Sequence, residues 1–207
     1  MKALIITAHI ENQDKLKIRD DYDMVICADA GYVRAKELSI KPDYLIGDYD
    51  SSALPKKEEY TNIRVLPCEK DMTDSEAALE AAVNMGCDYI DILGGLGGRF
   101  DHTMGNLGIL SKYTCPNRHV ALMDGQNYVF MLDPGMHTIS DLGYKYIGII
   151  SYGSSASNVT IENLKYELSG YELDNSTSLG VSNEFVSGNG RISFDKGRLL
   201  IIYSDDI

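Results

Sequence analysis

The sequence predicts an α/β protein: a doubly wound, mostly parallel sheet with flanking helices over residues 1–124, then a smaller antiparallel β-sandwich over residues 125–207. In the first part, short apolar runs alternate with segments of helical spacing, which is typical of a parallel sheet covered on both faces. Near Asp124-Gly125 the helical segments stop. Beyond that point, turn signals such as Asp133-Pro134-Gly135 and Gly188-Asn189-Gly190 separate short apolar runs, which indicates antiparallel strands.

Short apolar runs predict the strands of the first domain, and apolar residues at helical spacing predict its helices. The expected strands are residues 3–7, 24–28, 44–46, 63–66, 89–93 and 119–123. The expected helices are residues 32–38, 75–85 and 103–113. Thr73 and Glu76 fit a capping box ahead of the second helix. In the third helix we expect Met104, Leu107 and Leu110 to share one apolar face.

The second domain is expected to consist of strands, because no segment after Gly125 shows a convincing helical period. The expected strands are residues 128–132, 144–152, 158–161, 181–186, 190–194 and 199–203. A sandwich of about 75–85 residues lies within the usual size range of a domain.

Composition narrows the classes of function. The chain has 207 residues and a formal net charge of −12, which disfavours nucleic acid or a membrane as a partner. A polyphosphate ligand would therefore need local cations. No apolar run approaches the roughly 18–20 residues that span a bilayer, and the first residues show no signal-peptide pattern. The four cysteines form no C-x-x-C pair, so we expect reduced thiols and a cytoplasmic location.

A glycine-rich stretch, Gly94-Gly95-Leu96-Gly97-Gly98-Arg99, lies between a predicted strand and a predicted helix. Glycines let a ligand approach the backbone, and the start of the helix carries a partial positive charge that attracts an anion. Arg99 adds a planar fork of donors suited to phosphate oxygens. Asp101 is out of place beside an anion unless a metal cation lies between them. The alternative is an ordinary glycine-rich turn with an Asp as helix cap.

Acidic residues follow other predicted strands. Asp29 follows the second strand, where the alternative is a simple β–α turn. Asp48 and Asp50 follow the third strand, and in an extended segment both would point to the same side. Two neighbouring carboxylates repel each other unless they share a cation, and Mg²⁺ prefers oxygen ligands. A solvated acidic loop is the other interpretation of this pair.

Lys70, Asp71, Thr73 and Asp74 crowd the start of the second predicted helix. Capping explains the hydroxyl and one carboxylate, but hardly both acids. Because the carboxyl ends of parallel strands meet at one edge, we expect these acids to join those after the other strands. Carboxylates with a lysine and an arginine among them are typical of metal-assisted phosphoryl transfer.

Two common nucleotide motifs are missing from the sequence. It has no G-x-x-x-x-G-K-[ST] loop, and no G-x-G-x-x-G follows the first strand. His102 has two open interpretations: a hydrogen bond to a phosphate or help as an acid, and packing on its own helical turn.

Four blocks of the sequence resemble thiamine pyrophosphokinase, in that family's order and at its spacing. The blocks are Gly47-Asp48-Tyr49-Asp50-Ser51, Lys70-Asp71-x-Thr73-Asp74-x-Glu76, Gly94-Gly95-x-Gly97-Gly98-Arg99-x-Asp101-His102 with Gly105-Asn106-Leu107, and Val181-Ser182-Asn183-Glu184-Phe185. The resemblance implies transfer of a pyrophosphoryl group from ATP to the hydroxyl of thiamine, with Mg²⁺, giving thiamine diphosphate and AMP.

The resemblance also implies roles for particular residues. The expected metal ligands are Asp48, Asp50, Asp74 and Asp101, and Arg99 joins them in the catalytic set. The expected nucleotide-binding residues are Asp29, Lys70, Thr73, Gly97, Gly98, Arg99 and His102. The expected thiamine-binding residues are Tyr166, Ser182 and Asn183. An aromatic ring under a flat cationic ligand is physically reasonable.

Members of this family are homodimers whose thiamine site joins the first domain of one subunit to the second domain of the other, so the resemblance implies a homodimer. The sequence departs from the family at two places. Ala30 stands where relatives often have glycine, and Tyr166 stands where others have tryptophan. The methyl group of Ala30 is expected to alter how closely a nucleotide approaches.

Two other functions remain open from the residues. One is a pyrophosphokinase for another alcohol, such as a hydroxymethyl pterin. The other is a non-catalytic sensor of nucleotide or thiamine diphosphate. The Ser182-Asn183 block favours thiamine over a pterin, and a sensor has no need of both the metal acids and Arg99.

Overall fold

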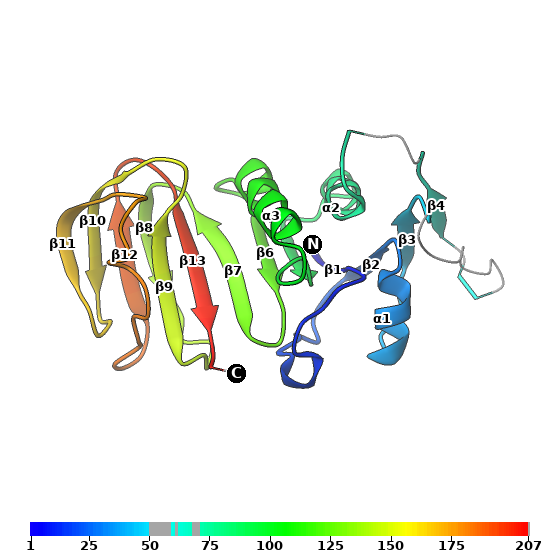
Figure 1. The fold of residues 1–207 in the computed structure, drawn as a ribbon, viewed down its shortest axis with the longest axis horizontal. Helices are drawn as coiled ribbons and strands as arrows, with labels where there is room; N and C mark the ends of the chain where they lie inside the picture. The colour runs from blue at the N-terminus through cyan, green and yellow to red at the C-terminus, as the bar shows by residue number, and fades with distance from the viewer. Residues whose placement is uncertain (50–58, 61, 68–70, 207) are drawn as a thin grey trace. The chain divides into compact units, whose positions relative to one another are not determined.

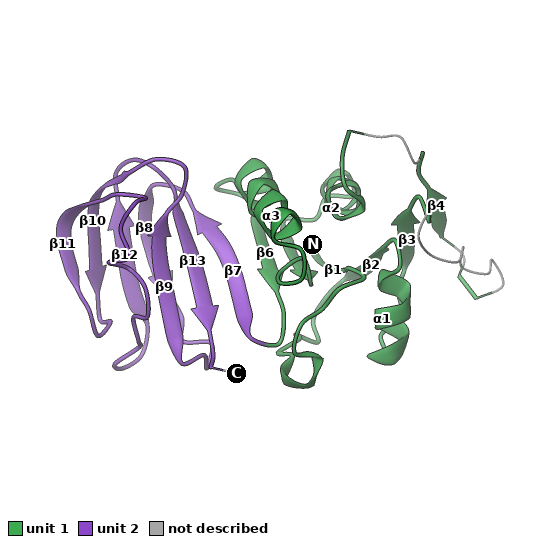
Figure 2. Cartoon of the chain, in the orientation of Figure 1, with its two compact units in different colours: residues 1–125 green, residues 126–207 purple. Residues whose placement is uncertain are grey.

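The computed structural model describes residues 1–49, 59–60, 62–67 and 71–206. The chain divides into two compact units, Met1–Gly125 and Gln126–Ile207 (Figure 2). Asp50, Lys70 and Cys68, about which the sequence made predictions, lie outside the described residues.

Unit 1 is built on a parallel sheet. Its strands are β1 (Lys2–Ile6), β2 (Met24–Ala28), β3 (Tyr44–Gly47), β4 (Ile63–Val65), β5 (Tyr89–Leu93) and β6 (His119–Met123). They lie in the order β4-β3-β2-β1-β5-β6, and each neighbouring pair is parallel. The order reverses between β1 and β5, so the predicted doubly wound sheet is confirmed.

Helices cover both faces of this sheet. They are α1 (Gly31–Glu37), α2 (Asp74–Asn84) and α3 (Phe100–Tyr113), and a short 3-10 turn, η1 (Gln13–Lys15), precedes β2. Figure 1 shows α1 on one side of the sheet and α2 and α3 on the other. The predicted cap of α2 is confirmed, because the hydroxyl of Thr73 accepts a hydrogen bond from the Glu76 N–H at 3.2 Å.

The buried face of α3 differs from the prediction. The helix buries Asn106, Ile109 and Leu110, whereas Met104 is 48% exposed. Each residue turns a helix by about 100°, so Met104 lies about 200° from Asn106 and points away from the sheet. Leu110 is buried as predicted and Leu107 is partly buried, so Met104 alone departs from the predicted face. The polar Asn106 packs inward, which the apolar pattern could not indicate.

Unit 2 consists of antiparallel strands. They are β7 (Asn127–Leu132), β8 (Gly135–Ile139), β9 (Tyr146–Ser151), β10 (Ala156–Glu162), β11 (Leu168–Leu173), β12 (Gly190–Phe194) and β13 (Leu199–Ser204). In one sheet β13 pairs with β7 and β9, and in the other the order is β11-β10-β12-β8. Buried side chains such as Ile147, Ile161 and Phe194 form the core of the unit.

Three details of unit 2 differ from the prediction. Residues 181–186 do not form a strand; they make only isolated bridges, Asn183 with Ile147 and Phe185 with Leu164. A left-handed backbone at Ser182, with φ of 58°, interrupts the extended run. The sequence pattern missed β8 and β11, whose residues are largely exposed and so carry little apolar signal.

No helix in the described part of the chain combines the length and the apolar character needed to cross a membrane. Cys27, Cys87 and Cys115 are free thiols, in agreement with the expected reduced state for these three described cysteines.

Candidate functional site

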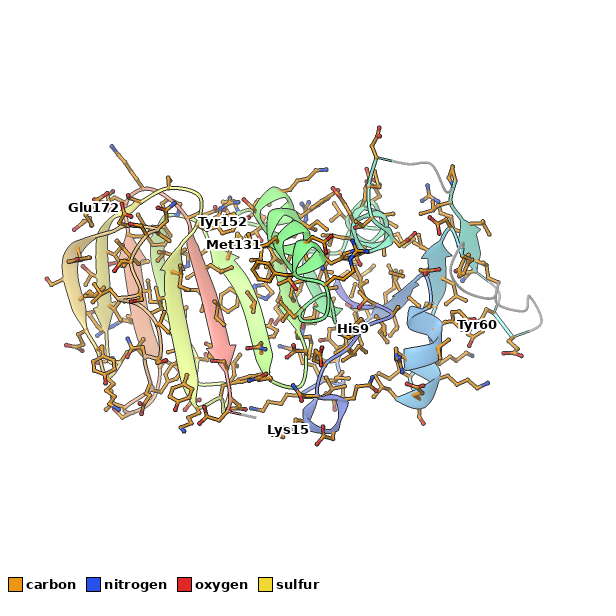
Figure 3. All side chains as sticks on the ribbon, viewed as in Figure 1. His9, Lys15, Tyr60, Met131, Tyr152 and Glu172 are labelled. Atoms are coloured by element: carbon orange, nitrogen blue, oxygen red, sulfur yellow. The ribbon has the colours of Figure 1, made fainter. Side chains whose placement is uncertain are left out.

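The loops at the carboxyl ends of β1, β2 and β5 meet where the strand order reverses, and they enclose a pocket of 510 Å³. This edge is where open α/β sheets bind ligands. The pocket is lined by Thr7, Ala8, His9, Ala28, Asp29, Thr73, Asp74, Ser75, Gly95, Leu96, Gly97, Gly98, Arg99, His102 and Asn106. His9, labelled in Figure 3, belongs to the segment that follows β1.

The glycine loop after β5 has a backbone that other residues rarely adopt. Gly94, Gly95, Gly97 and Gly98 have φ values of 100°, 77°, 74° and 57°. A Cβ at Gly94 would lie 2.1 Å from the Thr7 hydroxyl and 2.2 Å from the His9 carbonyl oxygen. The glycines are therefore required by conformation and by close packing against the loop after β1.

Side chains of α3 hold this loop in place. The Asn106 amide donates a hydrogen bond to the Gly95 carbonyl at 2.8 Å, and the Thr103 hydroxyl donates to the Gly97 carbonyl at 3.3 Å. α2 and α3 both begin at the pocket, since Asp74 and Arg99 line it. The partial positive charges of two helix starts therefore add to the Arg99 cation and favour an anionic ligand.

Arg99 and Asp101 pair with each other. Arg99 Nε lies 3.2 Å from Asp101 Oδ1, and Arg99 Nη2 lies 2.6 Å from Asp101 Oδ2. The guanidinium holds the pKa of Asp101 below its ordinary value, and the carboxylate raises the pKa of Arg99. Both groups are therefore charged at neutral pH. Asp101 does not line the pocket in this arrangement, whereas Arg99 does.

In the described part of the chain, the carboxylates of Asp29 and Asp74 line the pocket. The end of β3 lies beside them, because a Cβ on Gly47 would approach the Asp29 Cα to 2.7 Å. Asp48 follows Gly47 directly, although it does not line the pocket itself. Burial first, and then the nearby Asp29 and Asp74 carboxylates, raise the pKa of Tyr49. This corner of unit 1 is therefore strongly negative.

This donor set fits a hard divalent cation. Among the described residues, no group of three His, Cys, Asp or Glu side chains forms a ready-made metal cage. Mg²⁺ does not need one, because it keeps several waters and takes one or two carboxylates together with ligand phosphates. Carboxylates in an otherwise anion-attracting pocket repel a polyphosphate unless a cation lies between them. Asp29, Asp74 and the neighbouring Asp48 supply suitable oxygens.

The structure brings most of the predicted nucleotide-binding residues to this pocket: Asp29, Thr73, Gly97, Gly98, Arg99 and His102 line it. Asp74 joins them. Thr7, His9 and Asn106 also line the pocket, although no site role was predicted for them. A polar residue at a strand end, or Asn106 within the Gly105-Asn106-Leu107 block, was a usable signal. Ala30 does not line the pocket, and its φ of −66° accommodates a side chain, so the effect of its methyl group on a nucleotide stays a prediction.

A second pocket, of 670 Å³, lies within unit 2. Tyr166, Ser182 and Asn183, the three predicted thiamine-binding residues, all line it. The Tyr166 side chain is 56% exposed, and Lys165 Nζ lies 5.6 Å from the centre of its ring. Lys165 is held by Glu184 at 2.6 Å.

The fold and the first pocket define an α/β protein with a pocket suited to an anion at the carboxyl edge of a parallel sheet. Comparison with known proteins gives the family. Residues 16–123 match the thiamin pyrophosphokinase catalytic domain, and residues 136–199 match the thiamin pyrophosphokinase vitamin B1 binding domain. The chain belongs to the thiamine pyrophosphokinase family.

Individual relatives agree with this assignment. The thiamine pyrophosphokinase of Bacillus subtilis is 33% identical over 192 residues, which cover 90% of each chain. A crystal structure of thiamine pyrophosphokinase from Bacillus subtilis superposes with a TM-score of 0.89 and 30% identity over all of both chains. The structure of the Geobacillus thermodenitrificans protein gives a TM-score of 0.86 and 30% identity, covering 100% of this chain and 98% of that one.

Proposed function

We propose that this chain is a transferase that moves the pyrophosphoryl group of ATP to the hydroxyl of thiamine. The thiamine oxygen forms a bond to the β-phosphorus, the bond from that phosphorus to the oxygen of the α-phosphate breaks, and the hydroxyl proton is lost. The products are thiamine diphosphate and AMP. The observation that carries the proposal is the pocket in which glycine backbone, two helix starts and Arg99 face the carboxylates of Asp29 and Asp74.

The roles of the residues follow from their chemistry. The glycine loop and the starts of α2 and α3 bind the phosphates, and Arg99 stabilises the charge that develops on them during transfer. Asp48 and Asp74 hold Mg²⁺, with Asp50 and Asp101 as further proposed ligands. When bound, Mg²⁺ neutralises phosphate charge and orients the ATP. Lys70, Thr73 and His102 complete the proposed nucleotide site.

Thiamine is proposed to bind at the second pocket, with its rings against Tyr166 and near Ser182. An active assembly is proposed to be a homodimer in which unit 1 of one subunit and unit 2 of the other form each site, as the family resemblance implies. A cytoplasmic location, with neither nucleic acid nor membrane as partner, remains part of the proposal; the net charge of −12 and the free described thiols support it.

The two alternative functions are not favoured. A pterin-specific enzyme has no reason to match a vitamin B1 binding domain over residues 136–199. A non-catalytic sensor has no need of the acids and Arg99 at the start of α3.

The test is to mix the protein with ATP, Mg²⁺ and thiamine and to measure AMP and thiamine diphosphate, omitting each component in turn. We expect AMP only when all are present, and a chelator should abolish its formation until Mg²⁺ is restored. AMP that forms equally without thiamine would refute the proposed acceptor. Asp74→Asn should lose most activity. Glu80→Gln, which removes a charge from an exposed position of the same helix, is the matched control.

A further inference from the structure

The side chain of Asn183 is hydrogen-bonded to other residues of the same chain. The residue is 3% exposed, and its side chain makes three hydrogen bonds to described residues. Its Oδ1 accepts from the N–H groups of Tyr166 and Glu184, each at 2.9 Å, and its Nδ2 donates to the Tyr166 carbonyl at 2.8 Å. Two of these bonds hold both polar groups of one residue's backbone.

The two bonds to Tyr166 resemble those between two antiparallel strands, except that the side-chain amide of Asn183 takes the place of a backbone peptide group. One step along, the pairing is made by backbone: the Lys165 N–H donates to the Glu184 carbonyl at 2.9 Å. At Asn183 the backbone is already committed, because its N–H and carbonyl both pair with Ile147 of β9, at 3.0 and 2.8 Å. Only the side chain can continue the pairing to Tyr166. Asn183 therefore ties the segment after β10 to β9.

Hydrogen-bond capacity limits what Asn183 can offer a ligand. A side-chain amide oxygen has two lone pairs, and both acceptor positions of Oδ1 are used. The aminopyrimidine of thiamine carries an amino group that needs an acceptor. The side chain of Asn183 has no acceptor left for it.

The neighbouring side chains face the pocket instead. Tyr166 and Ser182 both line it; Tyr166 is 56% exposed, and Ser182 is exposed in a left-handed turn with φ of 58°. The position of the Tyr166 ring depends on the backbone that Asn183 holds, because Tyr166 lies in a loop between β10 and β11.

We propose that Asn183 is a positioning residue: its amide fixes the backbone of Tyr166 so that the Tyr166 ring, and not Asn183 itself, contacts thiamine. This inference rests on the proposed function, and it changes the role of Asn183 from contacting the ligand to holding the residue that does.

The test is a double-mutant cycle of Asn183→Ala and Tyr166→Ala, with KM for thiamine, KM for ATP and kcat measured for each enzyme. Asn183→Ala should raise the KM for thiamine about tenfold, since it removes the hydrogen bonds that hold the Tyr166 backbone and so position its ring. It should leave the KM for ATP and kcat within about twofold. In the Tyr166→Ala background, Asn183→Ala should raise the KM for thiamine by less than about twofold. Asn189→Ala, at an exposed position of unit 2, is the control.

If the effects of the two substitutions on the KM for thiamine multiply in full, the proposal is overturned. That result is expected when Asn183 contacts thiamine directly and independently of the Tyr166 ring. Asn183→Asp provides a second variant if Asn183→Ala does not fold. It keeps both acceptor bonds, loses the donor to the Tyr166 carbonyl, and should raise the KM for thiamine with kcat unchanged. An unchanged KM for thiamine would contradict the proposal.

Hydrogen exchange separates this inference from the proposed function. In the protein without substrates, the Tyr166 amide should exchange at least about tenfold faster in the Asn183 variants than in the wild type, while amides of β13 stay protected. Unchanged protection would overturn the positioning role even in an active enzyme. Absence of thiamine-dependent AMP formation in the wild type would instead overturn the proposed function.

Discussion

Arg99 and Asp101 form a two-point salt bridge at the start of α3, with Nη2 to Oδ2 at 2.6 Å and Nε to Oδ1 at 3.2 Å. Both side chains are largely exposed, so the pair contributes little to stability. An incoming phosphate can therefore exchange the carboxylate for its own oxygens at small cost. In the proposed site, that exchange would leave Asp101 free to bind a cation beside the phosphate.

Arg99→Ala should lower kcat by at least about 100-fold, because the developing phosphate charge loses its cation. Arg99→Lys should recover only part of the rate, since an ammonium lacks the planar fork of donors. The melting temperature should change by less than about 2 °C in both variants. Arg191→Ala, which removes an exposed arginine of unit 2, is the control; near-normal turnover of Arg99→Ala would refute the assigned role.

Gly94→Ala should destabilise unit 1 by several kcal/mol. The new Cβ would meet the Thr7 hydroxyl at 2.1 Å, and φ of 100° is unfavourable for alanine. Gly108→Ala is the matched change: Gly108 lies inside α3 with open space around its Cα, so alanine should stabilise by about 0.5–1 kcal/mol. Urea unfolding of the two variants measures both effects, and equal midpoints would contradict the argument.

Tyr49→Phe should keep or raise the stability of the substrate-free protein. The Tyr49 side chain is buried, and its hydroxyl has no hydrogen-bond partner among the described residues. A buried unsatisfied hydroxyl costs about 1–3 kcal/mol, which phenylalanine avoids. Thermal unfolding without ligands checks this expectation. A clear loss of stability would mean that the hydroxyl has a partner in solution.

His119 should make stability depend on pH. Burial, with a smaller contribution from Arg19, lowers its pKa to about 4 from the ordinary 6.5. Between these values the unfolded chain binds a proton that the folded chain does not. The contribution of His119 to stability is therefore complete above pH 6.5 and is lost as the pH falls toward 4.

His119→Phe tests this, because phenylalanine keeps a ring against Tyr89, whose centre lies 4.6 Å from the imidazole, and removes the titration. Between pH 7 and pH 4.5, the free energy of unfolding of the wild type should fall by about 2–3 kcal/mol more than that of the variant. Parallel pH profiles would refute the depressed pKa. His102→Phe is the control, because it removes an imidazole from an exposed position.

Apolar spacing, turn residues and helix caps predicted much of the fold, because they depend on the conformational preferences of short segments. The predicted bounds of β2, β5, β6 and β12 agree with the structure, and the Thr73 cap is confirmed. The pattern failed where a distant contact decided the outcome. Ser182 turns left-handed within a segment predicted to be a strand, and Asn106 packs inward because its amide reaches the Gly95 carbonyl.

By itself, the sequence determined the fold class, the glycine loop and the chemistry available to the site, because chain flexibility, helix caps and side-chain charge are properties of short segments. Only the tertiary structure decided that Asp29, Asp74 and Arg99 share one pocket while Asp101 pairs with Arg99. It also decided that Asn183 binds the backbone of Tyr166. Strand order and backbone pairing bring these groups together, and both depend on contacts between residues far apart in the chain.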